Sequence, residues 1–282
     1  MKISLALLIS SLLVACGGAP AKTQTDSQYV EAMAEEHNHD APVANPMSEG
    51  EKPVNVTGES VAYATVEGKA VNGYFVTPNE VADAPMIIVI HEWWGLNDNI
   101  KAMADKLAAQ GYRVLAVDLY GGVSATTPEV AKATMKTVMA KPELLQENLK
   151  QAIAFLEAKG TQKIGVLGWC FGGGWSLQTG FMAPDKIDAM VIYYGHLDAD
   201  KTKIATLKMP IIGFFGGQDK GIPIEGVKAF ESALIDAGAN AEIKIYPGAD
   251  HAFANPSGNN YQAEAAEDAW GKTLKFLDTN LH

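Results

Sequence analysis

The sequence is short of positive charge, and this shortage excludes one class of partner. Its 282 residues contain 22 Lys and Arg against 33 Asp and Glu, a formal net charge of −11. Proteins that bind nucleic acid usually carry a basic patch or stripe, because contacts with phosphates dominate their affinity. The chain has no lysine-rich tail and no basic amphipathic helix. We therefore expect no nucleic-acid partner.

Cysteine and arginine are also scarce. The two cysteines are Cys16, near the N-terminus, and Cys170, in the middle of the chain. This pair offers no disulfide framework of the kind that stabilises small secreted proteins. The single arginine is Arg113. Hydrophobic residues make up 48% of the chain, which is enough for the core of one large or two small domains.

The apolar run at the N-terminus, residues 3–14, is too short to span a bilayer. It follows Lys2, and together they predict an export signal over residues 1–15. The sequence Leu-Val-Ala-Cys that ends at Cys16 resembles the lipobox of bacterial lipoproteins, in which cleavage leaves a cysteine that is acylated. An ordinary cleaved signal peptide is the alternative. We expect Cys16 to be lipidated, and the protein to be exported and membrane-anchored, facing the periplasm or the cell exterior.

Residues 16–58 are rich in proline and in polar side chains, with little apolar periodicity. Such a composition buries too little surface to offset the entropy of ordering, so we predict a disordered tether there. The stretch from Tyr29 to Glu36 is compatible with one helical turn. The run from His37 to Asp40 is interpreted as solvated and polar rather than as a weak metal site.

A single folded domain is predicted over residues 59–282. Alternating apolar residues at 61–67 and 70–77 indicate an antiparallel hairpin. Beyond it, continuous apolar strands alternate with amphipathic helices, the pattern of a parallel sheet covered on both faces. The expected strands are 86–90, 114–117, 163–167, 187–194, 211–215 and 241–246, and the expected helices are 99–110, 128–140, 142–159, 171–182, 223–237 and 262–277.

A Gly-x-Cys-x-Gly turn, centred on Cys170 and flanked by Gly168 and Gly172, joins a buried strand to a helix. This pattern is typical of a nucleophile held in a strained conformation at the top of a sheet. The backbone N–H of Phe171 would then lie at a helix N-terminus and receive an oxyanion. A structural cysteine on a glycine-rich turn is the alternative.

Ligands of open α/β sheets bind at the carboxyl ends of the strands, so strand-end residues are the candidates. Asp219 and His251 follow the last two strands, after Cys170 in the chain. Nucleophile, acid and histidine in this order are typical of the α/β-hydrolase fold. The other histidines fit less well, because they lie in the tether, at the C-terminus or before the acid. Asp118 and Asp198 are interpreted as a strand terminus and a helix cap.

Five sequence blocks carry a family resemblance that covers nearly the whole folded domain. The blocks are His91-Glu92-Trp93-Trp94-Gly95, Asp118-Leu119-Tyr120, Gly168-Trp169-Cys170-Phe171-Gly172-Gly173, Gly217-Gln218-Asp219 and Asp250-His251-Ala252-Phe253. Through these blocks the chain resembles the dienelactone hydrolase (carboxymethylenebutenolidase) family.

The resemblance implies a Cys170–His251–Asp219 triad that hydrolyses enol-lactones through an acyl-enzyme, with no metal or organic cofactor. It also implies that Glu92 takes the proton of the resting thiol, and that the backbone N–H of Trp93 is a second oxyanion donor. Independently, a carboxylate beside two tryptophans at the end of a buried strand must be either paired or functional.

The substrate pocket is predicted to include four aromatic residues: Trp94, Tyr120, Trp169 and Phe253. Family members that act on carboxylated lactones hold the carboxylate with arginines, and one of these positions is Asn255 here. Arg113 begins a strand at the opposite end, and Lys does not replace a bidentate arginine clamp. We therefore expect a small lactone or activated ester as substrate, not necessarily one with a carboxylate.

Two other functions are compatible with the sequence. The first is a non-catalytic, envelope-tethered binding module on the same fold. The second is a redox thiol sensor, which would lack a resolving cysteine if Cys16 is acylated.

Overall fold

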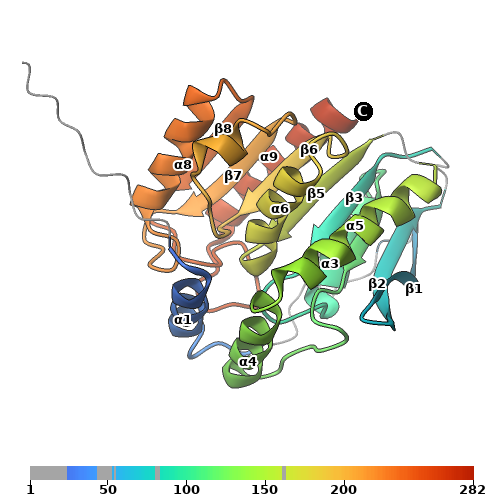
Figure 1. Cartoon of the computed structure of the whole chain (residues 1–282), viewed down its shortest axis with the longest axis horizontal. Coiled ribbons are helices and arrows are strands. Elements are labelled where there is room, and N and C mark those ends of the chain that lie inside the picture. The colour runs from blue at the N-terminus through green and yellow to red at the C-terminus, as the bar shows by residue number, and fades with distance from the viewer. Residues whose placement is uncertain (1–23, 43–52, 54, 80–82, 161–162) are drawn as a thin grey trace, which may run out of the picture.

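The computed structural model describes residues 24–42, 53, 55–79, 83–160 and 163–282. Its centre is an eight-stranded sheet in the order β1-β2-β4-β3-β5-β6-β7-β8 (Figure 1). The strands are β1 (Val56–Val66), β2 (Lys69–Pro78), β3 (Met86–Ile90), β4 (Arg113–Val117), β5 (Ile164–Trp169), β6 (Ala189–Tyr193), β7 (Ile211–Gly216) and β8 (Ala241–Tyr246). β2 pairs antiparallel with β1 and with β4, and the other neighbours are parallel. The predicted α/β fold with an N-terminal antiparallel hairpin is confirmed.

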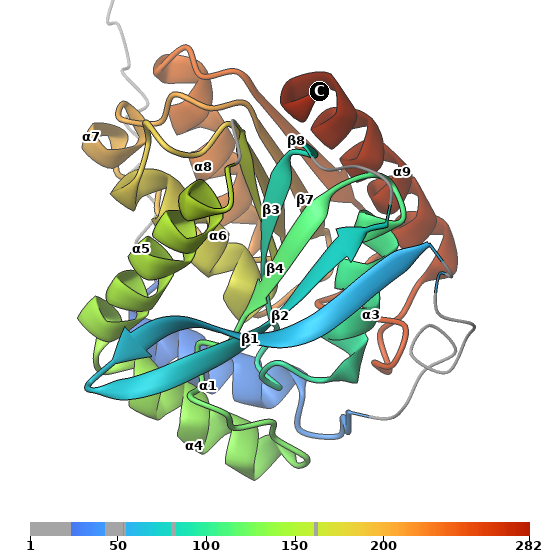
Figure 2. The same ribbon diagram turned by 90° about the vertical axis from the view of Figure 1, so that its right-hand side faces the viewer.

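Helices cover both faces of the sheet (Figure 2). They are α1 (Asp26–Glu36), α3 (Asp98–Ala108), α4 (Pro128–Met139), α5 (Pro142–Ala158), α6 (Phe171–Met182), α7 (Lys201–Ile204), α8 (Ile224–Asp236) and α9 (Ala263–Leu281). α3 and α9 lie on one face, and α5, α6 and α8 lie on the other. The central strands are therefore buried on both sides, as every residue of β3, β5, β6 and β7 shows.

The predicted elements of the folded domain are all present, with boundaries shifted by a few residues. The largest differences are at the two ends: β1 begins at Val56, before residue 59, and the last helix continues to Leu281 rather than ending at 277. Leu277 and Leu281 are buried, so the apolar stripe of α9 continues one turn further against the sheet.

The predicted tether over residues 16–58 is wrong for the part that forms α1. Thr25 caps this helix: its side chain accepts a hydrogen bond from the Gln28 backbone, and the Gln28 side chain accepts one from the Thr25 backbone. Tyr29, Val30 and Met33 are buried on one face. α1 lies beside α4 at the lower end of the molecule in Figure 1. Helical capping and burial of this apolar face offset the entropy that we expected to leave the segment disordered.

The predicted export signal and Cys16 lie outside the described residues. Within the part of the chain that the structure describes, no helix combines the length and apolarity needed to cross a bilayer.

Candidate active site

Cys170 lies between the end of β5 and the first residue of α6, with φ 54° and ψ −117°. The backbone of a non-glycine residue is strained in this conformation. The flanking glycines permit the close backbone contacts that hold it there. A Cβ on Gly168 would lie 2.2 Å from the carbonyl oxygen of Gly172, and one on Gly172 would lie 2.2 Å from that of Ile90. The two glycines therefore let β5, α6 and the end of β3 approach closely, as the motif predicts.

His251 and Asp219 meet at the same sheet edge. The Nδ1 of His251 donates a hydrogen bond of 2.7 Å to Oδ2 of Asp219, and both side chains are buried. The other carboxylate oxygen accepts a hydrogen bond of 2.7 Å from the backbone N–H of Ile222, which fixes its orientation. A ligand atom of His251 lies within 4.8 Å of the Cys170 sulfur. The structure thus brings together all three residues of the predicted triad.

The electrostatics of this cluster favour an ion pair. Burial alone raises the pKa of the Cys170 thiol, but the charges of His251 and His37 lower it to about 6. Burial lowers the pKa of His251, but the negative charges of Asp219 and Cys170 raise it well above its usual range. Both directions favour a thiolate beside an imidazolium, which is the reactive form of a cysteine nucleophile.

Glu92, at the start of the loop after β3, is buried and held by one amide. The side-chain nitrogen of Asn255 donates a hydrogen bond of 2.8 Å to Oε2 of Glu92. Burial raises the pKa of Glu92 to about 8, and the negative charge of Cys170 adds to this effect. Asn255 thus contacts Glu92, at the position where the resemblance leads us to expect a substrate-binding arginine. The Asn255 oxygen accepts hydrogen bonds from the backbone and the hydroxyl of Ser257.

The two predicted oxyanion donors follow directly after predicted active-site residues. Phe171 is the first residue of α6, where backbone N–H groups have no partner within the helix. Trp93 follows Glu92 in the loop after β3, and the close approach of Gly172 to Ile90 places this loop against the start of α6. Both N–H groups therefore belong to the two segments that meet at Cys170.

His91 and Asp118, the other strand-end histidine and aspartate considered for the roles of base and acid, have structural roles. His91 is buried: its Nδ1 donates to the backbone oxygen of Glu92 at 2.6 Å, and its Nε2 accepts from the backbone N–H of Leu119 at 3.1 Å. Both ring nitrogens are therefore occupied. Asp118 accepts hydrogen bonds from the backbone N–H groups of Tyr120 and Gly122 and so shapes the loop after β4.

Comparisons with known proteins place this arrangement in a family. The model of the dienelactone hydrolase family matches residues 71–281. This chain belongs to the dienelactone hydrolase family.

Two relatives support that assignment, and a solved structure shares the fold. A Saccharolobus solfataricus protein named as a carboxymethylenebutenolidase is 32% identical over 248 residues, covering 75% of this chain and 95% of its own. Protein usf of Aquifex pyrophilus is 33% identical over 222 residues, covering 76% of this chain and 95% of its own. A Klebsiella pneumoniae structure described as a dienelactone hydrolase has a TM-score of 0.71 at 24% identity, covering 79% of this chain and 98% of its own. These findings identify an ester or lactone hydrolase.

In this dienelactone hydrolase family member, the predicted pocket aromatics are divided between different surroundings. Trp94 packs edge-on against Trp93 in the loop after β3, and Tyr120 packs against His91 of that loop and Phe171 of the nucleophile turn. Trp169 lines a cavity of about 280 Å³ that is bordered by α3 and α9, and also a smaller pocket beside Glu92 and Asn255. Phe253 is fully buried between Tyr194 and Tyr246. Trp94 and Tyr120 therefore pack among residues of the nucleophile turn and the loop after β3, Trp169 belongs to that turn, and Phe253 is a core residue.

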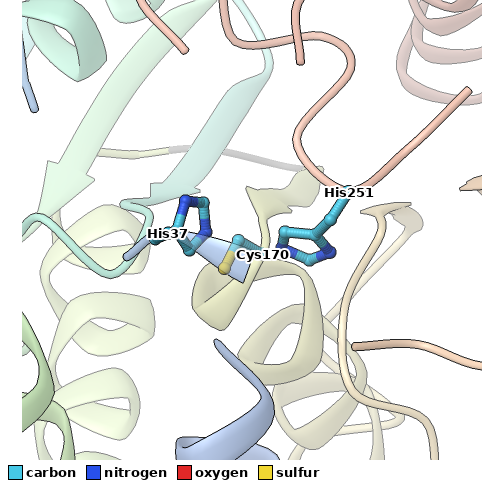
Figure 3. Close-up of side chains that lie close together, drawn as sticks. All are labelled: His37, Cys170 and His251. Atoms are coloured by element: carbon cyan, nitrogen blue, oxygen red, sulfur yellow. The ribbon is translucent and has the colours of Figure 1, made fainter. Parts of the chain in front are cut away.

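The sequence reasoning missed the segment that covers the nucleophile. Met33 of α1 places its sulfur 3.5 Å from that of Cys170, and Cys170 is only 1% exposed. His37, which follows α1, stacks on the ring of Trp93 at 4.5 Å and meets the ring of His251 edge-on at 5.3 Å. In Figure 3 the Cys170 side chain lies between the two imidazoles. The interpretation of His37 as a solvated residue is therefore wrong, because it is 3% exposed.

Proposed function

We propose that this chain hydrolyses small lactones or activated esters through an acyl-thioester on Cys170. The observation that carries the proposal is the buried hydrogen bond from His251 to Asp219 beside a cysteine on a strained, glycine-flanked turn. Asp219 fixes the tautomer and orientation of His251, and His251 stabilises the thiolate. The substrate that fits this chemistry has an acyl carbon open to attack and a good leaving oxygen.

The proposed reaction has two halves. The Cys170 thiolate attacks the acyl carbon, and the carbonyl electrons move to an oxygen held by the N–H groups of Phe171 and Trp93. The intermediate then collapses, the C–O bond breaks, and His251 gives its proton to the leaving alkoxide. A water molecule next attacks the thioester while His251 takes its proton, and the C–S bond breaks to restore the thiolate.

We also propose a role for Glu92 in the resting enzyme. Its raised pKa suits a carboxyl that accepts the thiol proton of Cys170 at rest and keeps it while the thiolate reacts. Asn255 holds that carboxyl in place through its amide.

The proposed substrates are neutral at the position where other family members bind a carboxylate. Asn255 is engaged with Glu92, and Arg113 lies at the amino end of β4, where it donates to the backbone oxygen of Lys159. A carboxylate bound without an arginine fork loses two parallel charge-assisted hydrogen bonds.

The location of the enzyme is a separate proposal that rests on the sequence. We propose that residues 1–15 direct export, and that Cys16 is acylated and anchors the chain to a membrane that faces the periplasm or the cell exterior. Labelling cells with a radioactive fatty acid tests this, since Cys16→Ala would remove both the label and the membrane association. Unchanged labelling in that variant would contradict lipidation at Cys16.

Turnover of p-nitrophenyl acetate and of a simple lactone tests the proposed chemistry. Cys170→Ala is expected to lower kcat at least ~10³-fold, because the nucleophile is lost while binding and the oxyanion donors remain. Mass spectrometry of a quenched wild-type reaction should show one acyl group on the peptide that contains Cys170. Equal turnover in wild type and Cys170→Ala would contradict the mechanism and favour a binding module on the same fold.

A further inference from the structure

Three metal-binding side chains converge at the covered nucleophile. One ligand atom from each of His37, Cys170 and His251 lies within 4.8 Å of the other two, and all three residues are buried (Figure 3). Hydrolysis uses only the last two. His37, which hydrolysis does not use, comes from the N-terminal segment after α1, outside the range that the family model matches.

Both imidazoles are oriented in the same way. His251 donates from Nδ1 to Asp219 at 2.7 Å, and His37 Nδ1 pairs with Oδ2 of Asp40 at 2.8 Å. A histidine that ligates a metal characteristically gives its other ring nitrogen to a carboxylate, which fixes the ring and raises the basicity of the ligating nitrogen.

Apart from the Cys170 sulfur, with which both histidines interact, the remaining ring nitrogens have no partner among the described residues. The Nε2 atoms of His37 and His251 are both buried without a hydrogen bond to any described residue. A buried polar atom without a partner costs free energy, and each such atom in a native protein calls for an explanation such as an ion. Two of them on either side of one sulfur, each on a ring held by a carboxylate, form a prepared donor set.

A thioether completes the set. Met33 Sδ lies 3.5 Å from the Cys170 sulfur. Two imidazoles and a thiolate suit both Zn²⁺ and copper, whereas a thioether is a donor for copper rather than for zinc. Bonds of about 2.0–2.3 Å require tetrahedral donors to lie roughly 3.3–3.8 Å apart, so the donors would need to close by about 1 Å.

We propose that His37, Cys170 and His251 form a binding site for a thiophilic metal ion, with Cu⁺ favoured over Zn²⁺ because Met33 supplies a fourth, thioether ligand. The ion binds to the thiolate and to two neutral imidazoles, so any proton on the Cys170 sulfur or on Nε2 of His37 or His251 is released to solvent on binding. The bound ion occupies the nucleophile and the base together, and it fixes α1 over them. The ion is therefore an inhibitor that holds the cover closed, and it takes no part in hydrolysis.

Metal binding is measured on the full chain, reduced and stripped with a chelator, without substrate. Co²⁺ serves as the optical probe for the Zn²⁺-type site, and Cu⁺ is added anaerobically against a colourless competing chelator. Wild type should bind one equivalent of each, with a thiolate-to-Co²⁺ charge-transfer band that Cys170→Ser abolishes. His37→Phe keeps an aromatic ring over Trp93 but has no donor atom, and it should weaken both ions at least ~100-fold. Asp40→Asn, which removes the carboxylate behind His37, should weaken them ~10–100-fold.

A matched control separates this site from ordinary histidine binding. His39 is exposed and lies two residues from His37, so His39→Ala should leave both affinities unchanged. Met33→Leu should weaken Cu⁺ and leave Co²⁺ unchanged, and equal Cu⁺ affinity in this variant would overturn the thioether ligand. The site itself is overturned if wild type binds neither ion, if His37→Phe binds as tightly as wild type, or if His39→Ala weakens binding equally. Because no substrate is present, these outcomes are independent of the hydrolase proposal.

Discussion

Two histidines meet the Cys170 sulfur, and they have different origins. His251 belongs to the loop after β8, within the range matched by the family model, and its carboxylate partner is anchored by the backbone of Ile222. His37 belongs to the segment after α1, outside that range, and its partner Asp40 accepts a longer hydrogen bond of 3.3 Å from the backbone of Asn259. Each histidine is paired with a carboxylate, but only His251 and Asp219 directly follow strands of the sheet.

This difference separates catalysis from access. In the proposed mechanism the side built on β8 positions a base, whereas the side built on α1 covers the sulfur. Substitutions on the first side should change the chemical step, and substitutions on the second should change how often the sulfur is exposed. The following predictions test this separation, beginning with the largest effect.

The paired carboxylates give the largest contrast. Asp219→Asn should lower kcat for p-nitrophenyl acetate by about 10⁴-fold, because His251 then loses its orientation and tautomer. Asp40→Asn should not lower kcat, because it loosens the cover and leaves the base intact. A steady-state comparison of the two variants checks this, and a comparable loss of kcat in both would contradict the division into a catalytic side and a covering side.

The packing of Met33 against Cys170 should control access to the thiol. Met33→Ala removes a fully buried side chain, and such losses cost about 2–5 kcal/mol. Since Cys170 is 1% exposed, alkylation by iodoacetamide requires α1 to open, and the rate should rise ~10-fold or more in the variant. Mass spectrometry of timed samples measures it.

A substitution outside α1, at Gly221, should also disturb the contact between Met33 and Cys170. A Cβ on Gly221 would lie 2.3 Å from the terminal methyl group of Met33. Gly221→Ala should therefore displace the Met33 side chain and accelerate alkylation while the sequence of α1 stays unchanged. If neither variant reacts faster than wild type, α1 does not limit access to the sulfur.

The amide that holds Glu92 should matter moderately. Asn255→Ala leaves a buried carboxyl without its donor, a loss of about 1–3 kcal/mol, so kcat/KM should fall ~10-fold. Ser257→Ala is the matched control, since the Ser257 hydroxyl donates to Asn255 but does not contact Glu92 through any hydrogen bond in the described residues. An equal loss in both variants would indicate that the loop, rather than the amide, is responsible.

The smallest effect is expected at the surface of α1. Glu31 and Lys132 form an exposed ion pair of 2.7 Å between α1 and α4. Water and salt screen exposed pairs, which therefore contribute little to stability, so Glu31→Gln should change the alkylation rate less than ~5-fold. A larger acceleration would show that α1 is held mainly by charge rather than by the packing of Met33.

The sequence predicted the framework of the site well because its signals are local. Continuous apolar strands predicted the parallel sheet. The glycines around Cys170 predicted the strained turn, because a residue with a Cβ would not fit the close backbone contacts there. The order of Cys170, Asp219 and His251 at strand ends gave their convergence, which follows from the topology of a parallel sheet.

The cover was missed for two different reasons. Its helix carried readable signals, because Thr25 and Gln28 form a capping box and Tyr29, Val30 and Met33 fall on one helical face. The proline- and polar-rich composition around it outweighed them. Its docking site could not be read from the sequence, because packing of Met33 and His37 against Cys170 and Trp93 depends on contacts far apart in the chain.

Cys170 is the single cysteine of the folded domain, since the other one precedes it at position 16. One sulfur atom therefore reports on two processes at once. Under the proposed mechanism its acylation follows turnover, and its rate of alkylation by iodoacetamide follows the opening equilibrium of the N-terminal helix. The protein carries its own kinetic probe, and no label or added residue is needed to time how long the sulfur stays shielded.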